Sequence, residues 1–114
     1  MLLCREVETR FKRDFISILK EAKKEKLSLL KENDEREKYY IKFLNDFIEE
    51  IEKRNNLFSE ELKNDIINHR INSYKLFLED KNNYYFLIEY ELFLEIRTYF
   101  NYLYKVYNNY KIIN

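Results

Sequence analysis

Residues 84–113, YYFLIEYELFLEIRTYFNYLYKVYNNYKII, decide the fold, because an aromatic stretch of this kind can form either a helix or strands. Tyrosine and phenylalanine favour strands, and the first half of the stretch partly alternates between apolar and polar residues. However, strands usually contain about five or six residues, and no turn signal divides these thirty. The sequence therefore predicts one helix over residues 84–113, with a break near residues 98–101 left open.

The whole chain of 114 residues contains no glycine and no proline. Tight β-hairpin turns usually need Asn-Gly or Asp-Gly, because their central residues have positive φ angles. Helices tolerate the absence best, since both residues destabilise helix interiors. The composition therefore predicts an all-α protein. This length fits one domain, and 46% hydrophobic residues are enough to form a core.

Apolar residues at steps of three and four predict three further helices, in residues 3–30, 35–53 and 59–79. The start of the last of these is the clearest, because Ser59 is a good N-cap and the two glutamates after it complement the helix dipole. Each connection contains asparagine, which tolerates the left-handed conformation that glycine usually supplies. We therefore expect a compact four-helix, bundle-like domain in residues 1–114, with short Asn-containing connections.

The four predicted helices differ in how their apolar residues are arranged. Each of the first three offers a single apolar stripe, and in the third this stripe runs from Leu62 to Leu78. The fourth has apolar residues on all sides, which is typical of a helix that is buried on several faces. If three single stripes cannot cover the fourth helix, part of its surface stays exposed.

Eight of the eleven tyrosines lie in the fourth helical segment. Tyrosine is favoured at protein interfaces because it combines a large apolar ring with a polar hydroxyl group. We therefore expect a non-catalytic interaction or assembly module that binds a partner protein, or a second copy of itself, through this helix. Core burial is the alternative for each ring taken singly. The candidate interface residues are Tyr99, Tyr102, Tyr107 and Tyr110.

The alternative function is that of an accessory subunit that binds nucleic acid through the first helix. Residues 1–31 hold nine Lys and Arg against five Asp and Glu, whereas residues 32–83 hold nine against thirteen. A basic helical face can neutralise phosphates, but an excess of this size also fits an ordinary solvated face. The net charge of zero gives no general attraction to nucleic acid. The candidate phosphate contacts are Arg10, Arg13, Lys20, Lys23 and Lys24.

The missing residue types disfavour most cofactor and metal chemistry. A P-loop, a dinucleotide-binding turn and an ordinary EF-hand loop all need glycine. One histidine, His69, and one cysteine, Cys4, are too few for a structural zinc site. We therefore expect no cofactor, no metal and no enzymatic activity. His69 is the one side chain that ordinarily titrates near neutral pH, and we expect it at the edge of the third helix's apolar stripe.

Cysteine content and hydropathy suggest the compartment. A single cysteine forms no intramolecular disulfide, which favours a reducing, intracellular and cytoplasmic setting. The N-terminal apolar run is far shorter than the apolar region of a signal peptide. Uncharged runs in residues 84–113 reach about seven residues, whereas a membrane span needs about twenty. We therefore expect no membrane span.

Overall fold

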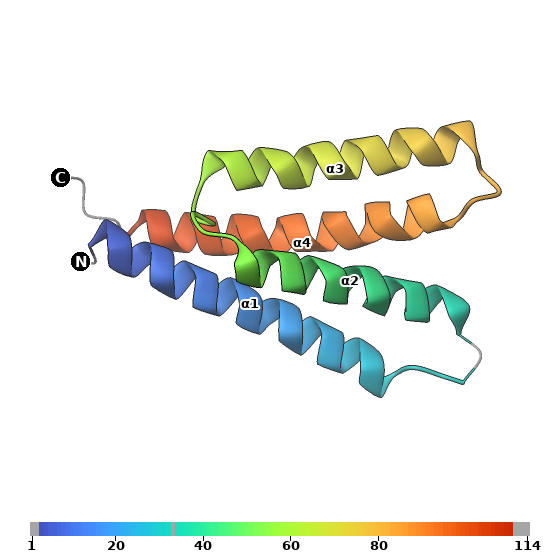
Figure 1. The fold of residues 1–114 in the computed structure, drawn as a ribbon, viewed down its shortest axis with the longest axis horizontal. Helices are drawn as coiled ribbons and strands as arrows, with labels where there is room; N and C mark the ends of the chain where they lie inside the picture. Colours follow the sequence, from blue (N-terminus) through green and yellow to red (C-terminus); the bar gives the residue numbers. More distant parts are fainter. Residues whose placement is uncertain (1–2, 33, 111–114) are drawn as a thin grey trace.

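The structure, a computed structural model, describes residues 3–32 and 34–110 (Figure 1). Its helices are α1 (Cys4–Ser28), α2 (Glu35–Lys53), α3 (Glu60–Glu79) and α4 (Tyr85–Asn108). The described part of the chain is 82% helical and contains no strand. The predicted all-α, four-helix fold is confirmed, and the helix bounds agree with the prediction to within two residues at every end but the last.

The last helix does not break where the sequence left that possibility open. Residues 98–101 lie inside α4, and the Thr98 hydroxyl donates a hydrogen bond to the carbonyl oxygen of Leu94 at 3.0 Å. The hydroxyl therefore adds to the regular helical bonding of that turn. α4 ends at Asn108, and the predicted end at residue 113 lies outside the described residues.

Short polar side chains cap the starts of α2 and α3, as expected for a chain without glycine. The Asp34 carboxylate accepts a hydrogen bond from the backbone N–H of Glu37 at 3.2 Å at the start of α2. The Ser59 hydroxyl accepts a hydrogen bond from the backbone N–H of Leu62 at 3.2 Å at the start of α3. Asn56, between these two helices, has a φ angle of 57°, the left-handed conformation that asparagine tolerates. The predicted cap at Ser59 and the predicted asparagine turn are therefore confirmed.

α4 is the central helix of the molecule. Figure 1 shows α3 on one side of α4 and the antiparallel pair α1–α2 on the other. α1, α2 and α3 all pack against α4, and α1 and α2 also pack against each other. The molecule measures 51 × 32 × 21 Å, so its thinnest dimension is about two helix diameters. The apolar residues on many sides of α4 therefore pack against three neighbouring helices.

Aromatic rings fill the middle of the core. The ring of Phe100 in α4 lies 5.4 Å from that of Phe11 and 5.7 Å from that of Phe15, with steep interplanar angles in both pairs. Such edge-to-face contacts are the favoured geometry for aromatic pairs. The buried apolar residues are Val7, Phe11, Phe15, Leu19, Tyr40, Leu44, Ile48, Ile51, Leu57, Leu62, Ile66, Ile88, Leu92, Phe93, Ile96, Phe100, Leu103 and Tyr107.

The apolar stripe of α3 is only partly covered. Leu62 and Ile66 are buried, whereas Ile71, Tyr74 and Leu78 remain 42% to 48% exposed. The reason is the position of α3 at the side of the molecule, where α4 is the helix that packs against it (Figure 1). One neighbouring helix cannot cover a stripe this broad. The sequence shows the stripe but not how much of it is buried.

No helix in the described part of the chain is both long enough and apolar enough to cross a membrane. α4 is the most apolar of the four, but carboxylates and Arg97 interrupt it.

Two leucines of α4 test this arrangement as a matched pair. Leu92 is 1% exposed and Leu94 is 40% exposed. Leu92→Ala should lower the free energy of unfolding by about 2–5 kcal/mol, because it removes buried methyl groups and leaves a cavity. Leu94→Ala should lower it by no more than about 1 kcal/mol. Urea unfolding followed by circular dichroism measures both values, and equal losses would contradict the packing described here.

Candidate functional site

The four candidate interface tyrosines have different environments. Tyr107 is a core residue, 8% exposed, and its hydroxyl donates a hydrogen bond to Asp14 of α1. Tyr99 is half-buried and donates to Glu95. Tyr102 and Tyr110 are exposed, at 66% and 53%. Tyr107 thus connects α4 to α1, Tyr99 is bonded within α4, and Tyr102 and Tyr110 remain available to a partner.

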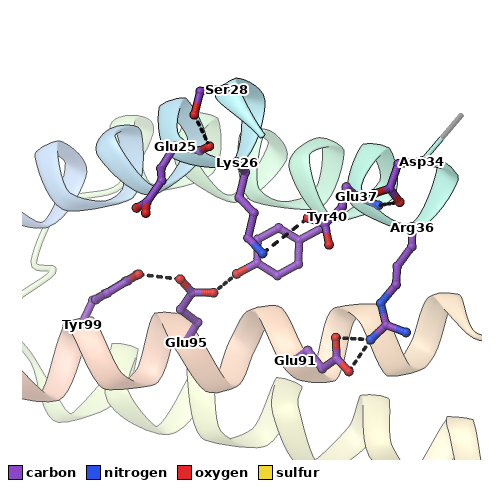
Figure 2. Close-up of polar contacts among 10 residues, drawn as sticks. All are labelled: Glu25, Lys26, Ser28, Asp34, Arg36, Glu37, Tyr40, Glu91, Glu95 and Tyr99. Carbon is purple, nitrogen blue, oxygen red and sulfur yellow. Dashed lines mark hydrogen bonds and ion pairs between the residues drawn. The ribbon is translucent and has the colours of Figure 1, made fainter. Parts of the chain in front are cut away.

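A polar cluster joins α1, α2 and α4 (Figure 2). The Glu95 carboxylate of α4 accepts hydrogen bonds from the hydroxyls of Tyr40 of α2 and Tyr99 of α4. The ammonium group of Lys26, from α1, lies 4.5 Å from the centre of the Tyr40 ring and 3.4 Å from Glu37. A carboxylate inside the bundle thereby gains two donors, which offset the cost of removing it from water.

The environment of this cluster keeps both tyrosines protonated. Burial raises the pKa of Tyr40, and the hydrogen bond to Glu95 raises it further. The same two causes, in the same order, raise the pKa of Tyr99. A hydroxyl that holds its proton so firmly is a hydrogen-bond donor and not a proton shuttle at neutral pH. The geometry indicates a connection between helices rather than a reactive site.

The next carboxylate along α4 forms a second connection to α2. The guanidinium group of Arg36 lies 2.5 Å from both oxygens of Glu91 (Figure 2). A charged pair bonded through both carboxylate oxygens holds its geometry better than a single contact. Glu91 and Glu95 are therefore both engaged on the side of α4 that faces α2.

His69, the one histidine, lies beside a groove between α2 and α3. Its ring stacks on that of Phe93 with 3.9 Å between centroids, and its Nε2 atom lies 3.3 Å from Oε2 of Glu89. The Ser73 hydroxyl donates to the same Glu89 oxygen at 3.2 Å. The groove measures about 270 Å³. Its lining is formed by Phe47, Glu50, Ile51, Arg54, Leu62, Asp65, Ile66, His69 and Phe93.

The polar groups beside this groove do not form a nucleophile and a base. In such a pair the serine hydroxyl donates to the histidine ring, and a carboxylate orients the ring from its other side. Here Ser73 and His69 both contact Glu89 instead. The three side chains tie α3 to α4. Among the described residues, no group of three or more His, Cys, Asp or Glu side chains is placed to hold a metal ion.

Several of the candidate phosphate contacts are used inside the molecule. Lys20 lies 3.3 Å from Glu52 of α2, and Lys23 donates to Asn45 of α2 at 2.6 Å. Arg13 bonds its neighbour Asp14 at 3.0 Å. Arg10 and Lys24 are exposed. The structure brings Lys20, Lys23 and Lys24 to one hollow between α1 and α2, which Glu49 and Glu52 also line, so the local charge is mixed.

The exposed apolar side chains form a surface that was not selected from the sequence. Ile71, Tyr74 and Leu78 lie on one side of α3, and the ring of Tyr74 is 5.0 Å from that of Tyr90 in α4. Leu94, one turn after Tyr90, is 40% exposed. We call these five residues the α3–α4 face. The signal in the sequence was the broad stripe of α3, but the number of helices that cover a stripe cannot be counted from spacing.

Comparisons with protein-family models, with curated proteins and with solved structures found no match for this chain. Its function is therefore inferred from its own surfaces and contacts.

The Glu95 cluster predicts how stability depends on alkaline pH. Because the pKa of Tyr40 is raised on folding, its stabilising effect is complete below about pH 10, the ordinary pKa of tyrosine, and is lost as the pH rises further. Tyr40→Phe should lower the free energy of unfolding at neutral pH by roughly 1–3 kcal/mol, because Glu95 loses one donor. The same substitution should also make the free energy of unfolding fall less steeply above pH 10.

Urea unfolding at a series of pH values from neutral to strongly alkaline gives both quantities. Tyr102→Phe is the matched control, because that side chain is exposed, and it should leave the stability and its alkaline decline unchanged. An alkaline decline in Tyr40→Phe as steep as in the unmodified chain would refute the role given to Tyr40.

Proposed function

We propose that this chain is a non-catalytic interaction module, which binds a partner protein or a second copy of itself through the outer side of α4 and the adjoining side of α3. One observation carries the proposal: of the eleven exposed large apolar side chains in the described residues, eight lie between residues 71 and 110. These eight are Ile71, Tyr74, Leu78, Tyr84, Tyr85, Leu94, Tyr102 and Tyr110.

Their arrangement matters more than their number. Single exposed apolar residues are normal on soluble proteins, whereas contiguous groups mark interaction surfaces. Ile71, Tyr74 and Leu78 follow one another at helical spacing, and Tyr74 contacts Tyr90 of α4. These side chains therefore form one surface across two helices. A partner that covers it would gain the free energy of burying apolar area.

The position of α3 supports the same proposal. A helix with an apolar stripe normally buries that stripe against the rest of the protein. α3 buries one side against α4 and leaves the other side of its stripe exposed. A further helix packed on the α3–α4 face would give α3 a second neighbour.

Site-specific photo-crosslinking in cells that produce the protein tests this function. A photoreactive phenylalanine analogue replaces one exposed residue at a time, at Leu94, Tyr74 or Tyr102. We expect discrete crosslinked species from the α3–α4 positions, because a partner there lies within reach of the probe. Self-association would give an adduct of twice the 14.4 kDa chain, and a different partner would give another defined mass.

The matched control carries the same analogue at Glu50, an exposed position on α2. It should give no discrete adduct. The proposed function is wrong if Leu94, Tyr74 and Tyr102 give no adduct, or if Glu50 gives the same adducts as they do.

A further inference from the structure

Around the contact between Tyr74 and Tyr90, the α3–α4 face carries positive charge. Residues 66–78 of α3 and residues 96–110 contain no Asp or Glu. The carboxylates in the first half of α4 are engaged elsewhere, on α2 or on the His69 side of α3. A partner that meets the face at the Tyr74–Tyr90 contact would find cations beside apolar side chains, whereas Ile71 also lines a hollow with Asp65.

Two arginines stand beside the apolar residues of this face. Arg70 precedes Tyr74 by four residues, and Arg97 follows Tyr90 by seven. On a helix these spacings return to the same side, so both arginines share the side that carries the contact between the Tyr74 and Tyr90 rings. The two cations therefore lie along the seam between α3 and α4.

Both arginines have a hydrogen-bond donor that is not used. The Nε atoms of Arg70 and Arg97 are buried and have no hydrogen-bond partner in the part of the chain that the structure describes. A buried N–H group without an acceptor costs free energy, and a partner outside the fold can reach each guanidinium group only through its outer nitrogen atoms. A carboxylate suits a guanidinium group best, because it can accept two parallel bonds from one such group.

The apolar part of the face extends over two helices. α3 and α4 run antiparallel and side by side (Figure 1), and the ring of Tyr74 on α3 lies 5.0 Å from that of Tyr90 on α4. Helices pack into the grooves between the side-chain rows of other helices. An amphipathic helix that lies in such a seam would anchor itself through residues spaced three and four apart.

Two other occupants fit the charges less well. In a symmetric dimer built on this face, the arginines of both copies would meet across the interface with no carboxylate between them, because the same patch faces itself. Nucleic acid would supply acceptors and would find the rings of Tyr74 and Tyr90 to stack on, but it would leave the aliphatic side chains of Ile71, Leu78 and Leu94 without an apolar partner. An acidic protein helix satisfies both the cations and the aliphatic side chains.

We propose that the occupant of the α3–α4 face is an acidic amphipathic helix of another protein, whose apolar side packs on Ile71, Tyr74 and Leu94 and whose carboxylates bind Arg70 and Arg97. The proposal rests on the proposed function, since it names the partner of the same surface. It commits to a different protein rather than a second copy of this chain. The arginines favour a partner with negative charge, and the apolar side chains supply the contact area.

Two designed peptides provide the probe. Both are helical and carry leucine at spacings of three and four with one tryptophan among the leucines; one has glutamate at its flanking positions and the other has lysine. The chain contains no tryptophan, so the fluorescence of the peptide reports its own burial. We expect the glutamate peptide to bind with a blue shift that weakens as salt is added, and the lysine peptide to bind at least about tenfold more weakly.

Charge reversal at the two arginines tests the assignment of residues. The double variant Arg70→Glu/Arg97→Glu should bind the glutamate peptide at least about tenfold more weakly and should bind the lysine peptide more tightly than the unmodified chain does. The neutral variant Arg70→Gln/Arg97→Gln is measured in parallel in case the reversal impairs folding, which circular dichroism reports. Arg13→Glu on α1 is the matched control and should leave binding unchanged.

The outcomes separate the two proposals. Equal binding of both peptides, or no binding of the glutamate peptide, overturns the inference about the partner. The inference about the partner is also overturned if the unmodified chain binds single-stranded RNA tightly and the arginine variants do not. If the glutamate peptide fails while crosslinks still form at Leu94 and Tyr74, the proposed function stands and only the nature of the partner is wrong. If the crosslinks are absent as well, both proposals fail.

Discussion

Burial of α4 among three helices is the constraint on which the rest of the structure depends. α4 supplies Phe100 to the aromatic centre of the core, Glu95 to the polar cluster with α2, and Glu89 to the contacts with α3. Each neighbouring helix therefore meets a different side of α4. Because the rows of side chains that serve these neighbours are fixed on one rigid helix, the positions of the α1–α2 pair and of α3 follow from it (Figure 1).

The polar contacts to α4 add direction to this apolar packing. Hydrophobic burial is not directional, so apolar stripes alone permit helices to slide or rotate. Glu95 and Glu91 each contact one defined residue of α2, namely Tyr40 and Arg36 (Figure 2). Pairs of this kind cost free energy if a helix shifts, because a half-buried carboxylate would then lose its donor. They select one alignment of α2 along α4.

Local features of the fold were predictable from the sequence, and long-range ones were not. The cap at Ser59, the left-handed turn at Asn56 and the helical state of α4 follow from residue type and spacing within a few positions. Tyr102 and Tyr107 look alike in the sequence, yet one is exposed and the other is a core residue. Their difference depends on where α1 lies, which spacing does not reveal. The apolar side chains left exposed on α3 could not be predicted for the same reason.

The position of α3 against a single helix has a consequence for motion. α3 lies between α2 and α4 in the chain, but its buried residues are only Leu62, Ile66 and Ser73, whereas α4 has seven. Segments with few buried contacts open more readily than the global unfolding reaction, so the amide protons of α3 should exchange with solvent before those of α4. Such local opening leaves α1, α2 and α4 assembled. Any molecule that covers α3 adds its binding free energy to the packing that already keeps this helix closed, and it slows the exchange of α3 in proportion to how tightly it binds.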